Sequence, residues 1–91
     1  GGSTSVNTGS INFDVDTPCT IIGFADRFTG NLTFSLRVDG STVRSAQNFS
    51  QIGDTCTLVT ETTVTAGTHS FEFVSSGGTN GLSIVVLGTQ R

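Results

Sequence analysis

Apolar and polar residues alternate along most of the chain with a period of two, which is the periodicity of a strand that buries one face. The alternation is clearest over residues 10–16, 32–38, 56–64 and 69–73. No segment places apolar residues at the spacing of a helical face. The pattern therefore predicts a chain that is built from β-strands.

Residues that favour turns separate these runs at intervals of about ten residues, which is typical of β-sandwiches. Asp39-Gly40 lies between the runs 32–38 and 42–49, and both of its positions tolerate the positive φ angles of a tight hairpin. Further turn signals are Thr17-Pro18, Thr29-Gly30-Asn31, Ala66-Gly67 and the glycine-rich stretch 77–81. We expect an antiparallel, jelly-roll-like β-sandwich of seven or eight strands over residues 10–91, and a linker or stalk remnant over residues 1–9.

Residues 82–87 depart from the alternation, because Leu-Ser-Ile-Val-Val-Leu is apolar on both parities. Ile21, Ile22 and Phe24 show the same doubling. A strand of a two-layer sandwich needs only one apolar face. The second apolar parity predicts either a wholly internal strand or a face that another subunit covers. Val85, Leu87 and Ile22 are therefore candidate residues of a subunit interface.

Composition and charge favour the same fold and exclude two classes of partner. The chain has 16 Thr and seven Phe but no Lys or Met, a mixture that suits strands better than helices. The net charge is −3, and the four arginines are scattered along the chain. Nucleic acid binding is therefore not expected. No apolar run approaches the length of a membrane span, so membrane insertion is not expected either.

The residues that catalysis or metal binding would need are scarce. His69 is the one histidine, and it shares a parity with Phe71 and Phe73, which indicates a strand position with a satisfied hydrogen bond rather than a Ser–His–Asp arrangement. Asp14 and Asp16 share one strand face, where carboxylates usually only solvate a surface; calcium binding is the alternative. We predict no catalytic residue, no metal and no cofactor.

Two cysteines, Cys19 and Cys56, are candidate disulfide partners. A bridge between them would close a long loop and stabilise the domain by roughly 4 kcal/mol in the chain-entropy model. The alternative is a pair of buried free thiols, which pack as small hydrophobic residues. The sequence leaves both possibilities open, because the redox compartment is not visible in it.

Loop residues supply the candidates for ligand binding, because recognition usually lies on loops that a rigid scaffold presents. Phe28 has charged neighbours and is either a stacking platform or a core residue. The candidate binding residues are Asp26, Arg27, Phe28, Asn31 and Asn80.

Three short stretches resemble trimeric jelly-roll head domains of the tumour-necrosis-factor/C1q-like type, which end many phage tail fibres, viral spikes and collagen-like bacterial proteins. They are residues 36–41 (Leu-Arg-Val-Asp-Gly-Ser), 65–71 (Thr-Ala-Gly-Thr-His-Ser-Phe) and 82–88 (Leu-Ser-Ile-Val-Val-Leu-Gly). The resemblance implies a homotrimer that covers the second apolar face of the last strand. It also implies a distal head at a virion surface or in another extracellular setting, with a cell-surface glycan or protein as receptor.

Three functions follow as hypotheses. The first is a trimeric fibre or spike head that attaches to a host-cell receptor, with a glycan as the expected ligand. The second is a structural cap that trimerises a fibre and recognises nothing. The third is a monomeric carbohydrate-binding module of a secreted protein. An enzyme is not expected.

Overall fold

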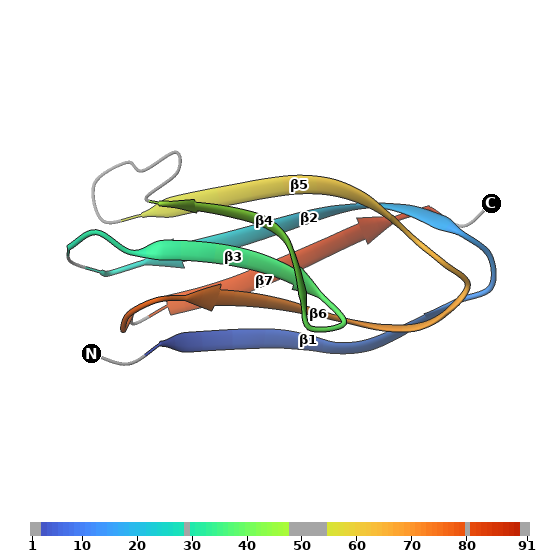
Figure 1. Cartoon of the computed structure of the whole chain (residues 1–91), viewed down its shortest axis with the longest axis horizontal. Helices are drawn as coiled ribbons and strands as arrows, with labels where there is room; N and C mark the ends of the chain where they lie inside the picture. Colours follow the sequence, from blue (N-terminus) through green and yellow to red (C-terminus); the bar gives the residue numbers. More distant parts are fainter. Residues whose placement is uncertain (1–2, 29, 48–54, 80, 90–91) are drawn as a thin grey trace.

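The structure, a computed structural model, describes residues 3–28, 30–47, 55–79 and 81–89. Within these ranges seven antiparallel strands form two sheets that pack face to face (Figure 1). The strands are β1 (Thr4–Phe13), β2 (Thr17–Asp26), β3 (Thr33–Val38), β4 (Ser41–Gln47), β5 (Cys56–Val64), β6 (Gly67–Ser75) and β7 (Gly81–Gly88). The prediction of an all-β antiparallel sandwich is confirmed.

Strand pairing is nested, as in one long hairpin that has been folded over on itself. β1 pairs with β6, β2 with β5, and β3 with β4. The four-stranded sheet has the order β1-β6-β3-β4, and the three-stranded sheet has the order β5-β2-β7. This nesting is jelly-roll-like, and β7 extends it as an edge strand beside β2.

The connections between strands lie at two opposite ends of the sandwich, because consecutive strands run in opposite directions. The start of β1 lies at the same end as the β2–β3 and β6–β7 connections, which we call the N-terminal end. The turns β1–β2, β3–β4 and β5–β6 lie at the opposite end, together with the end of β7 (Figure 1). We call this the far end.

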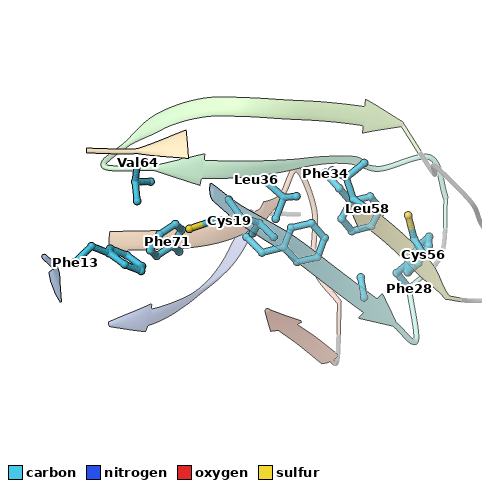
Figure 2. Packing of buried hydrophobic residues seen from close by; sticks show 12 residues of the cluster. Phe13, Cys19, Phe28, Phe34, Leu36, Cys56, Leu58, Val64 and Phe71 are labelled. Carbon is cyan, nitrogen blue, oxygen red and sulfur yellow. The ribbon is translucent and has the colours of Figure 1, made fainter. Parts of the chain in front are cut away.

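Phenylalanine rings fill the space between the sheets (Figure 2). Phe34 and Phe73 stack with their ring centroids 5.7 Å apart, and Phe28 meets Phe34 edge-on at 5.3 Å. Phe34, Phe71 and Phe73 are fully buried, and each contributes about 1.5–3 kcal/mol by its removal from water. Their alternation along β3 and β6 is the reason that these strands were predictable.

The first strand starts earlier than expected. Residues 4–9, which we predicted as linker, form the first half of β1, and Thr4 to Asn7 pair with Ser75 to Glu72 of β6. A bulge follows, because the register shifts between Asn7 and Ser10 and Gly9 has a φ of 90°. The segment has few apolar side chains, so the alternation did not predict it as a strand. Its backbone groups are instead satisfied by hydrogen bonds to β6.

The cysteines do not form the candidate disulfide. Cys19 and Cys56 are both buried free thiols. Cys19 lies opposite Thr62, whereas Cys56 lies opposite Ala25, six positions further along β2. Six residues of strand span about 20 Å, which is far beyond the reach of a disulfide. The alternative of two buried thiols holds, and burial raises the pKa of both.

Candidate functional site

The outward-facing surface of the three-stranded sheet, called the outer face below, is the most unusual surface of the molecule. In β2 the residues of one parity, Thr17 to Ala25, point into the core, so the other parity points outward. Residues opposite each other in a sheet share a face, and the register of β5 and β7 with β2 therefore fixes the rest. The outer face comprises Pro18, Thr20, Ile22 and Phe24 of β2, Thr57, Val59, Glu61 and Thr63 of β5, and Ser83, Val85 and Leu87 of β7.

Apolar side chains from all three strands meet on the outer face. Val59, Ile22 and Val85 lie in one row across the sheet. Phe24 and Leu87 flank this row on its two sides. Side chains opposite each other in a sheet are about 5 Å apart, so the five residues are contiguous. Val85 is 49% exposed, Leu87 55%, Val59 42% and Phe24 39%.

The outer surface of the four-stranded sheet is polar by contrast. Arg37 of β3 pairs with Glu72 of β6 at 3.7 Å, and the hydroxyl groups of Ser35 and Ser45 are 3.3 Å apart. Val43 of β4 is exposed on this sheet. The outer surface of the four-stranded sheet is therefore mainly polar, whereas that of the three-stranded sheet carries a row of exposed aliphatic side chains.

The predicted interface residues lie on the outer face. Val85 and Leu87 point away from the core, and Ile22 lies half-buried between its two neighbouring strands. β7 is an edge strand and pairs only with β2 among the described strands, so the alternative of a wholly internal strand is wrong. Phe24 and Val59 complete the patch. The doubled apolar parity of β2 indicated Phe24 in the sequence. Val59 could not be found in this way, because the other residues on its face of β5 are polar.

A hollow of about 570 Å³ lies on the outer face toward the far end. Two rows of side chains surround it: Pro18 and Thr63 with Thr89, and Thr20 and Glu61 with Leu87. Cys19, Thr62 and Gly88 lie between these rows and form its base. Within the described part of the chain, the side chains of Thr20, Glu61, Thr63 and Thr89 make no hydrogen bond.

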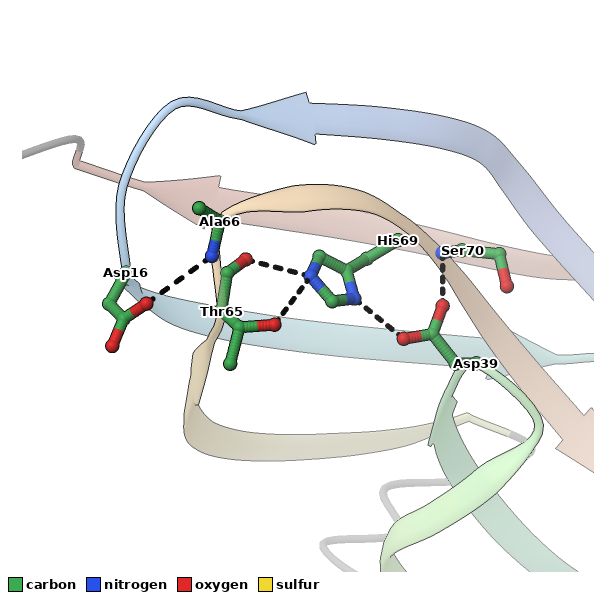
Figure 3. Close-up of polar contacts among 6 residues, drawn as sticks. All are labelled: Asp16, Asp39, Thr65, Ala66, His69 and Ser70. Carbon is green, nitrogen blue, oxygen red and sulfur yellow. Dashed lines mark hydrogen bonds and ion pairs between the residues drawn. The ribbon is translucent and has the colours of Figure 1, made fainter.

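A cluster of hydrogen bonds joins the three turns of the far end (Figure 3). The Nδ1 atom of His69 lies 2.6 Å from Oδ2 of Asp39, and Nε2 lies 2.8 Å from the carbonyl oxygen of Thr65. The amide of Ser70 donates to Asp39 Oδ1 at 2.9 Å. The amide of Ala66 donates to Asp16 Oδ1 at 3.3 Å. We call the Asp39–His69–Thr65 contacts the clasp.

The clasp has the carboxylate–imidazole–hydroxyl order of a hydrolase triad, because the Thr65 Oγ1 atom lies 3.4 Å from His69 Nε2. The carbonyl oxygen of Thr65 is nearer, however, and a carbonyl oxygen only accepts hydrogen bonds. Nε2 therefore carries a proton and cannot take one from the hydroxyl group. The imidazole ring holds two turns together rather than activating a nucleophile.

The clasp favours the charged forms of both partners. The hydrogen bond from Nδ1 to Asp39, reinforced by the contact with the Thr65 carbonyl group, raises the pKa of His69 above its ordinary value of 6.5. The same bond to His69, with the amide of Ser70, lowers the pKa of Asp39. When it is protonated, His69 can donate from both ring nitrogens, to Asp39 and to the carbonyl oxygen of Thr65.

The predicted binding residues divide between surface and core. Asp26, Arg27 and Asn31 lie at the N-terminal end, where Arg27 Nε contacts Asp26 Oδ1 at 3.3 Å. Phe28 is 3% exposed and packs in the core, so its ring has no open face for stacking and the core alternative holds. Asn80 lies outside the described residues.

The described residues form neither a metal-ligand cluster nor a membrane-spanning helix. In residues 3–28, 30–47, 55–79 and 81–89, no three His, Cys, Asp or Glu side chains are grouped so that they could hold a metal ion. No helix of this part of the chain has the length and apolar character to cross a membrane. No protein-family model matches the sequence, and no curated protein or solved structure is significantly similar to it.

Proposed function

We propose that this chain is the self-assembling head domain of a trimeric fibre or spike of a phage or virus, and that it attaches to a receptor on a host-cell surface. The observation that carries the proposal is the row Val59–Ile22–Val85, flanked by Phe24 and Leu87, on the outer face. Each of these half-exposed side chains contributes roughly 1 kcal/mol when a partner covers it. A chain of 91 residues gains from such burial, because its own core is small.

Copies of the same chain are the partner that fits this patch. The patch is uncharged, and Glu61, the nearest charged residue of the outer face, lies at its margin on β5. A copy that is centred on the row Val59–Ile22–Val85 and on Phe24 buries apolar groups and leaves Glu61 at the rim of the contact, where its carboxylate stays in water; burial of an unpaired carboxylate would be costly. Around a threefold axis each subunit contacts two neighbours. The resemblance to trimeric jelly-roll heads supports this stoichiometry.

The direction of the chain supports placing the receptor at the far end. A stalk joined before β1 would meet the N-terminal end, where Asp26, Arg27 and Asn31 lie. The turns of the far end and the hollow would then be distal. Three equivalent distal surfaces raise avidity without a strong single site. This argument moves the proposed receptor contact away from the loops that we predicted from the sequence.

Light scattering at micromolar concentration tests the assembly. Three copies of the 9.4-kDa chain have a mass of about 28 kDa, and this is the mass that we expect. A chain that remains monomeric under these conditions would contradict the proposal. A monomer that binds saccharides would instead support a carbohydrate-binding module, which the hydroxyl-lined hollow favours as the second candidate. A trimer without any ligand would leave the structural cap.

A further inference from the structure

We propose that the hollow on the outer face is a saccharide-binding site that takes a neutral sugar through its vicinal hydroxyl groups. Its biological role rests on the proposed receptor attachment. The binding itself requires only the folded chain. The hollow has a volume of about 570 Å³, which lies within the range of small-molecule sites.

The polar groups of the hollow suit a polyol. Glu61 projects from β5 and Thr20 projects beside it from β2, while Thr63 and Thr89 stand on the next row. Their side chains make no hydrogen bond within the described residues. A carboxylate accepts from two neighbouring hydroxyl groups, and a threonine hydroxyl both donates and accepts. These four side chains can therefore bind a diol in place of water without losing a hydrogen bond inside the protein.

Apolar groups complete the match. Pro18 lines the hollow on the row that lies farther from the apolar patch. Leu87, which the hollow shares with that patch, is 55% exposed in the single chain. Sugars carry C–H groups on their ring faces beside their hydroxyl groups, so they need both kinds of surface. The base between the rows is formed by Cys19, Thr62 and Gly88.

Charge selects among sugars. Among the residues that the structure describes, Glu61 is the one charged residue that lines the hollow, and the chain carries a net charge of −3. A sialylated or sulfated sugar would place its own negative charge beside this carboxylate, which is unfavourable. The site should therefore prefer neutral hexoses and N-acetylhexosamines to acidic sugars.

Amide chemical shifts measured by NMR during titration with monosaccharides test the site. The probes are the methyl glycosides of glucose, galactose, mannose, fucose and N-acetylglucosamine, with sialic acid as the acidic comparison. We expect at least one neutral sugar to shift the amides of Thr20, Thr62, Thr63 and Thr89, and sialic acid to leave them unchanged. Absence of any shift, or shifts confined to Asp26, Arg27 and Asn31, would overturn the assignment.

Two matched variants sharpen the test. Glu61→Gln removes the charge that accepts the sugar hydroxyl groups, and we expect binding to weaken about tenfold or more. Glu72→Gln makes the same chemical change on the opposite sheet, where Glu72 pairs with Arg37, and should leave binding unchanged. Equal effects of the two variants, or tighter binding of a lysine- or arginine-containing peptide than of any sugar, would contradict the proposal.

The sugar titration and the test of the proposed assembly can succeed or fail independently. A monomer that binds sugar in the hollow would refute the trimer and keep the site. A trimer that binds none of the probes would keep the assembly, and it would refute the site if the Val85→Asp chain, whose outer face is not covered by a copy, binds none of them either.

Discussion

The clasp is the residue-scale feature with the clearest chemical consequence. Both ring nitrogens of His69 face acceptors, the Asp39 carboxylate and the Thr65 carbonyl oxygen. Two other carboxylates, on the adjoining β1–β2 turn and on β6, have partners of their own: Asp16 accepts from Ala66, and Glu72 pairs with Arg37. His69 therefore depends on Asp39 for its charge balance, and the β3–β4 and β5–β6 turns depend on that pair for their connection.

The clasp predicts how stability depends on pH. Because folding raises the pKa of His69, its contribution is fully present below the ordinary value of 6.5 and is lost as the pH rises through the folded pKa. Because folding lowers the pKa of Asp39, its contribution is present above 3.8 and is lost as the pH falls through the folded pKa. Thermal unfolding should therefore give the highest Tm in mildly acidic solution, with a fall toward alkaline pH.

Substitutions identify the residues responsible for that fall. His69→Gln and Asp39→Asn should each flatten the loss of Tm between about pH 6 and 9. Asp26→Asn, at the N-terminal end, serves as the control and should keep the slope of the unchanged protein. If His69→Gln left the slope as it was, the clasp would not be its cause.

Gly23 is a residue whose lack of a side chain the core packing requires. A Cβ atom at this position would lie 2.5 Å from Cδ1 of the buried Phe73 ring. We expect Gly23→Ala to lower the free energy of unfolding by about 1–3 kcal/mol, because the core cannot admit the methyl group without moving the ring. Urea unfolding measures this change. Gly78→Ala, whose Cβ atom would meet nothing within 4 Å, should be nearly neutral, and equal losses from the two changes would be inconsistent with the overpacking argument.

At the scale of elements, alternation predicted the strands that border the core. The runs 32–38, 56–64 and 69–73 correspond to β3, β5 and β6. The Asp39-Gly40 turn was predictable from its residues, and both positions have positive φ angles, 52° and 83°. The first half of β1 was not predictable, because residues 4–9 contain little apolar signal and pair with a strand more than sixty positions away.

Removal of the first nine residues tests the role of β1. A linker would be dispensable, but Thr4 to Asn7 form part of the four-stranded sheet, and Val6 packs against the core. We expect a chain that lacks residues 1–9 to have a clearly lower Tm than the full chain. A chain that lacks residues 1–3 removes nothing from β1 and provides the comparison. Equal melting of all three chains would restore the interpretation as a linker.

The candidate site was predictable only in part, for a geometrical reason. Val85, Leu87 and Ile22 were identifiable because doubled apolar parity is visible within one strand. The hollow draws Glu61, Thr20 and Leu87 from strands that only the sheet register brings together. The same register separates Cys19 from Cys56, and nothing in the spacing of the two cysteines indicates it.

At the scale of the whole molecule, the two sheets present opposite surfaces to water. The four-stranded sheet carries an ion pair and hydroxyl groups on its outer surface, with Val43 as its one exposed large apolar side chain among the described residues, whereas the three-stranded sheet exposes Val59, Phe24, Val85 and Leu87. Copies that meet through the outer face would hide its apolar patch and leave the polar sheet as the surface of the assembly.

Sedimentation equilibrium of matched valine variants tests this claim most directly. Val85→Asp places a charge within the outer face, and Val43→Asp places the same charge at an exposed position of β4, in the other sheet. We predict that the unchanged chain and Val43→Asp sediment as trimers of about 28 kDa and that Val85→Asp sediments as a folded 9.4-kDa monomer. A mass that is the same for Val85→Asp and Val43→Asp would contradict the account.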